Sequence, residues 1–345
     1  MGDFVSLLAA PFVGCLLIAA LHCYMGLHVI RRGIIFVDLA LAQLAALGAT
    51  VALLVVPLVF GETLHEHHEG LAGHEHHEAV ARGPAVEGLA PEDGVTAGGT
   101  SVVPDEHPAE EEHAGGARTW LMEETPYLLS LLFAFAGAGL FALGRFRDER
   151  VPHEAIIGIV FVVSAALAVL VLSKAPHGHE QMESMLVGSI LFVGWHDAWM
   201  MLLLYLPLGV LHFAVRRRLL AISEDIHAAE SAGVPVRAWD FLFYITFGLM
   251  VTQSVRMAGV LVVFSYLIIP AVCASMLVSG FGRRLLVAWG IAVAASVIGL
   301  ALSAVKDLPT GPSLVATFGA ALVLCALVRP MVLRLAGGTS TSRTR

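Results

Sequence analysis

The densest set of side chains able to bind a metal lies in residues 61–118, where histidine and glutamate are interleaved. The pentapeptide His-Glu-His-His-Glu occurs at residues 65–69 and again at residues 74–78. Neutral imidazole is a good ligand for Zn²⁺, Ni²⁺ and Cu²⁺, and neighbouring carboxylates raise the local concentration of cations. The candidate metal ligands of this segment are His65, His67, His68, His74, His76, His77, His107 and His113. The alternative is a solvated acidic insert without a metal, or a pH-sensitive tether.

The same segment is rich in Gly, Pro, Glu and His and poor in large apolar residues, which predicts a loop that is disordered without a ligand. A flexible tract imposes little geometry on a metal, so we expect moderate affinity and poor selectivity. Nothing in the segment is apolar enough to span a membrane. It is therefore interpreted as a collector or sensor of metal and not as a transport site.

Two smaller polar features lie elsewhere. His177 and His179 form an H-x-H-E pattern with Glu180, which indicates either a metal site at the mouth of a pathway or an ordinary solvated loop. Asp38 lies within an apolar run, where a charge costs ~2.5–3.5 kcal/mol at mid-bilayer and marks a functional candidate. The alternative for Asp38 is a salt bridge to Arg32, two helical turns away.

The rest of the chain must position these groups, and its composition indicates a membrane protein. Of 345 residues, 57% are hydrophobic and 14% are charged, with a mean hydropathy of +0.81. Soluble domains are about 25% charged, so an ordinary cytosolic enzyme is excluded. Lipid offers the backbone no hydrogen-bond partners, so each apolar run must be a helix. The runs lie near residues 4–29, 35–60, 126–144, 155–173, 186–215, 239–256, 259–280, 285–305 and 312–333.

These runs predict an all-α polytopic protein with about nine transmembrane helices. A count of eight with a re-entrant segment in 239–280 is the alternative, because Pro270 interrupts that stretch. The expected organisation is helices 1 and 2 in residues 1–60, the His/Glu-rich loop at 61–118, the remaining helices in 119–335 and a flexible tail at 336–345.

Charge is distributed unevenly along the chain and sets the expected orientation. Residues 61–118 carry a net charge of −11 and the remainder +3, which leaves no basic surface for nucleic acid. With Arg31 and Arg32 inside, fifteen of the twenty Lys and Arg residues fall on the inner side, as the positive-inside rule requires. This predicts an external N-terminus and a cytoplasmic C-terminus. The four cysteines stand singly in apolar runs, which is typical of small buried side chains and not of a disulfide framework.

Four stretches of the chain are similar to the motifs of one protein family. Residues 26–48, GLHVIRRGIIFVDLALAQLAALG, are similar to G-x-x-V-x-R-R-x-x-F-V-G-D-A-L-x-H-x-x-L-P-G. Residues 186–191, LVGSIL, resemble L-F-G-x-I-L, and residues 259–274, GVLVVFSYLIIPAVCA, resemble G-V-L-L-V-x-A-L-L-I-I-P-A-A. Residues 307–312 read DLPTGP, similar to D-x-P-T-G-P. The order and spacing agree over nearly the whole chain outside the histidine loop, so the chain resembles the membrane permease of bacterial ABC importers for zinc, manganese or iron.

The resemblance implies a homodimer in the inner membrane with a cytoplasmic ABC ATPase dimer and an external metal-binding protein. The chain contains no G-x-x-x-x-G-K-[ST] phosphate loop, so ATP hydrolysis is expected in a partner and no enzymatic activity in this chain. In such importers a short cytoplasmic helix seats in the ATPase. Residues 219–240 resemble that docking segment at Ser223, Asp225, Ala229 and Gly233, and the alternative is an ordinary helix on the membrane surface.

The second apolar run departs from the family pattern. Family members carry an Asp and, four residues later, a His, and the matching positions here are Leu39 and Gln43. Asp38 stands one residue earlier, which turns its side chain by about 100° around a helix. We expect Asp38 and Gln43 in the transport pathway, and no permanently bound cofactor beyond the transported ion.

The predicted function is import of a divalent transition metal, with zinc favoured by the histidines, and with ATP hydrolysed by another subunit. An ATP-independent secondary transporter is the alternative, but it requires several intramembrane carboxylates or histidine pairs, and Asp38 is nearly alone. An intramembrane enzyme lacks support because no H-E-x-x-H or G-x-S-x-G occurs. A receptor lacks a large cytoplasmic signalling segment.

Overall fold

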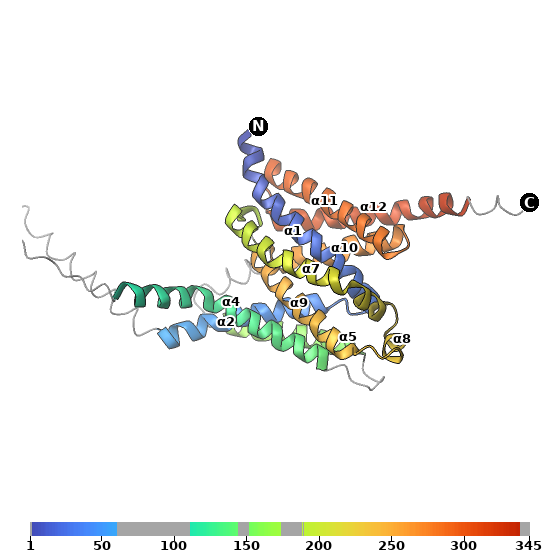
Figure 1. Ribbon diagram of the computed structural model, residues 1–345. Helices are drawn as coiled ribbons and strands as arrows, with labels where there is room; N and C mark the ends of the chain where they lie inside the picture. The colour runs from blue at the N-terminus through green and yellow to red at the C-terminus, as the bar shows by residue number, and fades with distance from the viewer. Residues whose placement is uncertain (1, 61–110, 144–151, 174–187, 189, 339–345) are drawn as a thin grey trace, which may run out of the picture. The chain divides into compact units, whose positions relative to one another are not determined.

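The computed structural model describes residues 2–60, 111–143, 152–173, 188 and 190–338, and these are helical apart from short connections (Figure 1). The elements are α1 (Gly2–Arg32), α2 (Val37–Phe60), α4 (Glu111–Leu143), α5 (His153–Leu172), η1 (Ile190–Phe192), α7 (Trp195–Glu224), α8 (Ile226–Ser231), α9 (Val236–Ala258), α10 (Val260–Leu277), α11 (Phe281–Lys306) and α12 (Thr310–Gly338). Within these ranges each of the nine apolar runs contains one long helix. The all-α prediction is confirmed.

Eight of these helices are long and apolar enough to cross a membrane, and α2 adds the shorter apolar stretch Val37–Leu53. Large apolar side chains are exposed on the outer helices, as Leu170 of α5 and Leu203 and Phe213 of α7 show. A soluble protein rarely exposes so much contiguous apolar surface, whereas lipid covers it without cost.

One helix boundary differs from the sequence-based expectation, and one alternative is excluded. Helix α4 begins at Glu111, so the last eight residues assigned to the loop at 61–118 are helical. The alternative break at Pro270 is wrong, because α10 continues through it. The break lies at Gly259, whose φ is +79°, between the predicted runs 239–256 and 259–280.

The chain divides into two units, residues 1–51 with 127–345, and residues 52–126. All the side-chain contacts described below lie within the first. In that unit α1 packs against α7, α10 and α11, and α12 packs against α10 and α11. Helix α1 is accordingly lined with buried side chains, among them Ile18, Met25 and Val29.

Glycines of the quoted motifs permit close approach of these helices. A Cβ on Gly26 would collide with the backbone carbonyl of Leu267 in α10. Gly188, with φ of +65°, lies against the backbone of Ala258 and Gly259. Small residues allow membrane helices to approach at backbone distance, so three of the motifs are in contact through their glycines.

Candidate functional site

The first candidate residue, Asp38, is the second residue of α2, and its side chain is 1% exposed. In the described part of the chain its Oδ1 has no hydrogen-bond partner, and the ion pairs found there are Arg31–Glu224 and Arg32–Asp240. The salt bridge from Asp38 to Arg32 is therefore wrong as an alternative. An ionisable side chain buried in this way within a membrane protein usually marks an ion or substrate path.

Gln43, the second residue expected in the pathway, is half-buried on the same helix. Five positions separate it from Asp38, which places the two side chains about 140° apart around the axis. No hydrogen bond joins them among the described residues. Leu39, at the position where the family has Asp, packs against the apolar core.

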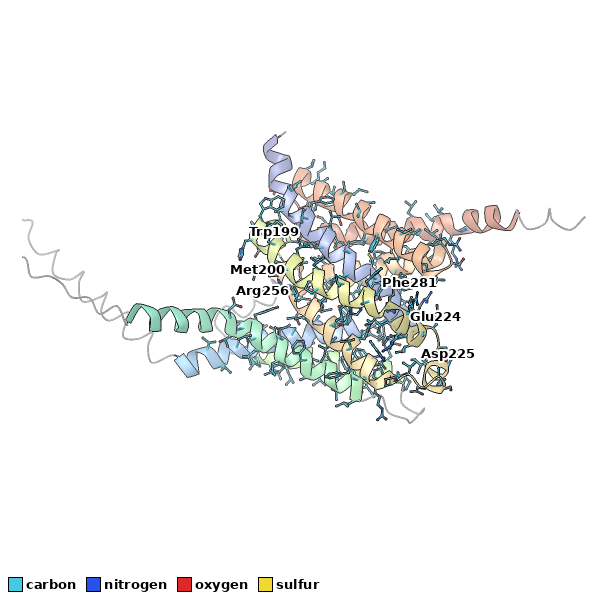
Figure 2. The ribbon with its side chains drawn as sticks, viewed as in Figure 1. Trp199, Met200, Glu224, Asp225, Arg256 and Phe281 are labelled. Atoms are coloured by element: carbon cyan, nitrogen blue, oxygen red, sulfur yellow. The ribbon has the colours of Figure 1, made fainter. Side chains whose placement is uncertain are left out.

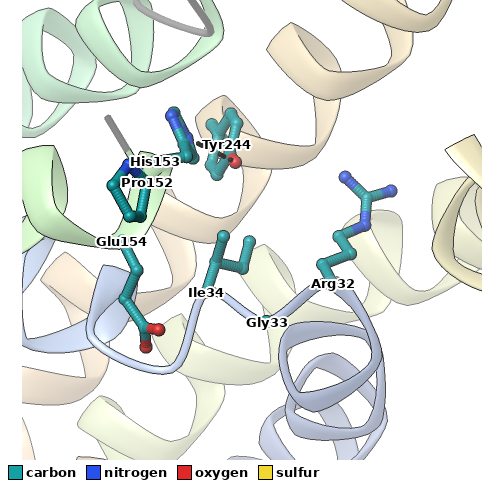
Figure 3. Close-up of a pocket in the computed structure, with 7 residues that line it drawn as sticks. All are labelled: Arg32, Gly33, Ile34, Pro152, His153, Glu154 and Tyr244. Atoms are coloured by element: carbon teal, nitrogen blue, oxygen red, sulfur yellow. Dashed lines mark hydrogen bonds between the residues drawn. The ribbon is translucent and has the colours of Figure 1, made fainter. Parts of the chain in front are cut away.

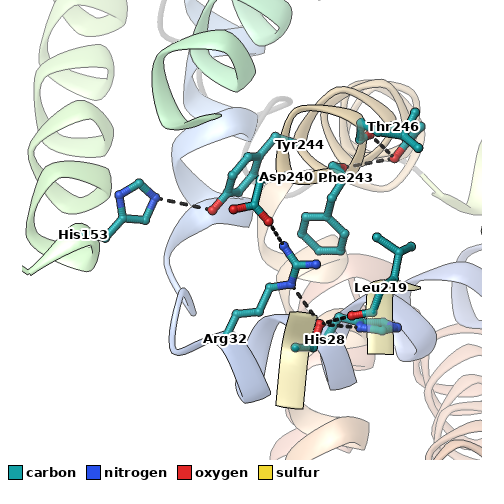
Figure 4. A network of polar contacts seen from close by, with 10 residues as sticks. His28, Arg32, His153, Leu219, Asp240, Phe243, Tyr244 and Thr246 are labelled. Carbon is teal, nitrogen blue, oxygen red and sulfur yellow. Dashed lines mark hydrogen bonds and ion pairs between the residues drawn. The ribbon is translucent and has the colours of Figure 1, made fainter. Parts of the chain in front are cut away.

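A buried polar network joins the C-terminal ends of α1 and α7 to the start of α9 (Figure 4). Nη1 of Arg32 lies 2.7 Å from Oδ1 of Asp240, and Nε of Arg32 donates to Oγ of Ser223 at 2.9 Å. Ser223 donates to the carbonyl of Leu219 at 2.8 Å, so Nδ1 of His28, also 2.8 Å away, is the donor in its bond to Ser223. The Arg32 guanidinium lies 4.2 Å from the ring centroid of Phe243. Charge-assisted and cation–π contacts together hold this side chain in one position.

The segment expected to dock the ATPase follows directly. Asp225 accepts a hydrogen bond from the backbone N–H of Ala228 at 2.9 Å and caps α8, while Gly233 adopts φ of +78° just beyond it. Ala229 is buried with Ile222 and Val236 in a small apolar cluster. Figure 2 shows Glu224 and Asp225 where the chain leaves α7, with Trp199 and Met200 near the other end of that helix.

Four residues were expected to dock the ATPase, and their side chains have different surroundings in the structure. Ser223 is buried and bonded to Arg32, so its side chain is turned away from any partner on the surface. Asp225 and Gly233 shape the backbone of the segment. Residues 227–233 are all exposed apart from Ala229. Docking itself remains a prediction.

A pocket of about 250 Å³ lies beside the corner between α1 and α2 (Figure 3). Its lining residues are Arg32, Gly33, Ile34, Pro152, His153, Glu154 and Tyr244. The Tyr244 hydroxyl and Nε2 of His153 are 3.3 Å apart. The pocket therefore borders both the polar network and the start of α5.

Four further polar residues in or beside the apolar helices have identified contacts. Nδ1 of His22 donates to the carbonyl of Ile18, and Nε2 of His212 lies 2.8 Å from Oγ1 of Thr246. The Arg256 guanidinium lies 5.2 Å from the ring centroid of Tyr127. Asp197 accepts from the N–H of Gly194 at the start of α7. These contacts agree with packing and capping roles.

The predicted histidine ligands fall almost entirely outside the described residues: His65, His67, His68, His74, His76, His77, His107, His177 and His179. The backbone of His113 lies in α4. Within the described ranges no group of three or more His, Cys, Asp or Glu side chains is placed to hold a metal. The metal-binding role of the loops stays a prediction.

Sequence reasoning missed Asp240 and His28. Asp240 is the last residue of the docking segment and lies at the start of an apolar run, and an acid in that position was the available signal. Nothing in the sequence pairs it with Arg32, which is 208 residues away.

Comparison with known proteins agrees with this architecture. The sequence model described as the ABC 3 transport family matches residues 113–329. The "Manganese transport system membrane protein MntC" of Listeria innocua is 25% identical over 196 residues, covering 55% of this chain and 69% of that protein. The "Chelated iron transport system membrane protein YfeC" of Yersinia pestis is 27% identical over 186 residues, covering 54% and 63%.

Two solved structures share the fold. "PsaBC from Streptococcus pneumoniae in complex with Fab" aligns with a TM-score of 0.62 at 15% identity, over 94% of each chain. "An inward-facing conformation of a putative metal-chelate type ABC transporter" aligns with a TM-score of 0.53 at 15% identity, over 95% of this chain and 84% of the other.

Proposed function

Because the chain belongs to the ABC 3 transport family, we propose that it imports a divalent transition metal ion, with zinc as the favoured ion. The family and the apolar helices make it a multi-pass protein of the bacterial inner membrane and a transport subunit of a metal ABC transporter. The direction of transport, the ion and the partners belong to the proposal. Two relatives are named for manganese and chelated iron, so these ions are the main alternatives to zinc as the transported ion.

The observation that carries the proposal is the buried carboxylate of Asp38. Its Oδ1 lacks a partner among the described residues, while Arg31 and Arg32 are bonded elsewhere. A carboxylate in an apolar setting is stabilised by a passing divalent cation, which supplies an opposite charge that no ion pair of the described residues provides. Carboxylate oxygen binds zinc, manganese and iron alike, so this group supports a metal path without selecting the ion.

Zinc is favoured by the histidines of residues 61–118, which raise the local concentration of a borderline-soft cation at the membrane surface. In the proposed orientation the N-terminus and this loop are external. The C-terminus and residues 219–240 are cytoplasmic, next to an ATPase dimer. Two copies of the chain form the pathway, and an external metal-binding protein delivers the ion.

Uptake measurements test this assignment. Cells that lack their own high-affinity metal uptake and express the chain with its ATPase should accumulate radioactive zinc, and a hundredfold excess of manganese should compete weakly. Strong competition by manganese or iron would assign the ion differently while keeping the transport function. If cells with the permease accumulated no more zinc, manganese or iron than cells without it, the transport function itself would be refuted.

A further inference from the structure

The C-terminal end of α1 holds both ends of the segment that leads through α8. The residues before the segment are bound through Ser223, which accepts from Nε of Arg32 at 2.9 Å. The residues after it are bound through Asp240, whose Oδ1 lies 2.7 Å from Nη1 of the same arginine. One guanidinium thus bridges the exit of α7 and the entry of α9 (Figure 4).

The two neighbouring arginines differ sharply in their surroundings. The side chains of Arg32 and Asp240 are 3% and 1% exposed, whereas Glu224, the partner of Arg31, is 64% exposed. Exposed pairs contribute little because water screens them, but removal of one partner from a buried pair leaves an uncompensated charge. Arg32 is therefore a rigid connection and Arg31 a weak one.

The segment between the two bonded ends is itself internally packed. Asp225 caps α8, and Ala229 packs with Ile222 before the segment and Val236 after it. A displacement of the exposed face of α8 is consequently passed to Ser223 and Asp240 and is not absorbed within the segment.

Arg32 is also adjacent to the start of α2. The corner that follows it is closed by backbone hydrogen bonds from Ile34 to Val29 at 3.2 Å and from Val37 to Ile34 at 3.1 Å, with φ of +66° at Gly33. Asp38 is the next residue after this corner. The corner residues Arg32, Gly33 and Ile34 line the 250 Å³ pocket, so the corner has room to shift (Figure 3).

We propose that Arg32 is the positioning residue that couples the α8 segment to Asp38 in the metal path, through its simultaneous bonds to Ser223 and Asp240. This inference rests on the proposed function, since it assumes that an ATPase moves α8. Loss of these bonds uncouples ATP hydrolysis from metal transport, although the residues that hydrolyse ATP and the proposed metal-path residue Asp38 are still present.

The test uses the permease with its ATPase in proteoliposomes and measures zinc accumulated per ATP hydrolysed. Ser223→Ala removes one hydroxyl from the network. The paired variant Arg32→Met with Asp240→Leu replaces the ion pair by apolar side chains, a change that often leaves stability intact. We expect each to lower the zinc-to-ATP ratio by about threefold to tenfold while ATP hydrolysis and assembly are retained. Arg31→Gln is the matched control and should keep the wild-type ratio.

A purely structural role predicts a different result, because the paired variant would then recover the wild-type ratio together with its stability. That result, or an unchanged ratio in Ser223→Ala, overturns the proposal. If the paired variant does not assemble, Ser223→Ala decides alone, with a lowered ratio in support and an unchanged one against. If wild-type vesicles accumulate no metal with ATP, the proposed function fails first, which distinguishes that failure from a failure of Arg32.

Discussion

Asp38 and Asp240 are two equally buried aspartates with opposite surroundings. Each is 1% exposed and each stands in the first turns of an apolar helix, α2 or α9. Asp240 has a guanidinium at 2.7 Å, whereas Oδ1 of Asp38 has no partner in the part of the chain that is described. The contrast shows that burial of a carboxylate does not by itself identify a transport site. In the proposed function, what separates the structural charge of Asp240 from the pathway charge of Asp38 is whether a described residue supplies the counter-ion.

The largest expected effect is the loss of stability when Asp240, the aspartate paired with Arg32, is changed. Asp240→Asn leaves Arg32 buried without its counter-charge and should lower the stability of the folded permease by about 3–5 kcal/mol. Thermal unfolding of the purified protein measures this, and Arg31→Gln, at the exposed pair, should change the midpoint little. A midpoint equal to wild type for Asp240→Asn would show that the ion pair does not stabilise this junction.

The same substitution at the other aspartate should act on transport and not on stability. Asp38→Asn removes a charge whose Oδ1 has no hydrogen-bond partner among the described residues, so the unfolding midpoint should stay constant or rise. Metal uptake should fall about tenfold or more, because a contact with a charged group is worth roughly 1.5–3 kcal/mol. Full uptake by Asp38→Asn would remove this residue from the pathway.

A third effect of intermediate size concerns α1, which ends in Arg32, the partner of Asp240, and is followed by α2, where Asp38 lies. Gly26→Ala places a Cβ against the carbonyl of Leu267, and overpacking of this kind costs about 1–3 kcal/mol. Gly139→Ala is the matched control, since a Cβ there meets nothing within 4 Å. Equal unfolding midpoints for the two variants would mean that α1 and α10 separate easily at Gly26.

The helices could be predicted from the sequence, but the polar contacts between them could not. Apolar runs predicted all nine long helices of the described part, because lipid admits only helices of a minimum length. The break at Gly259 agrees with the predicted runs 239–256 and 259–280. The alternative break at Pro270 does not occur, since a proline is tolerated inside a membrane helix when neighbouring groups satisfy the backbone. Sequence proximity had suggested Asp38 as an alternative partner of Arg32. The true partner, Asp240, is brought in only by the packing of α1, α7 and α9.

The smallest expected effect comes from the histidine loop, which lies apart from both aspartates in the proposed mechanism. Deletion of residues 61–110, which leaves α4 intact, should lower uptake at limiting external zinc by less than about tenfold, since in the proposed function the loop only raises the local ion concentration. Uptake at saturating zinc should not change. A loss at every zinc concentration would instead place the loop in the transport step.

The central claim is that this chain is a passive cation pathway driven by a separate ATPase, and vesicles of defined composition test it most directly. Purified permease alone, with a proton gradient and external zinc, manganese or iron, should accumulate no metal. Addition of the ATPase and ATP should produce accumulation that Asp38→Asn reduces. Metal accumulation driven by the gradient in vesicles that hold only the permease would contradict the account.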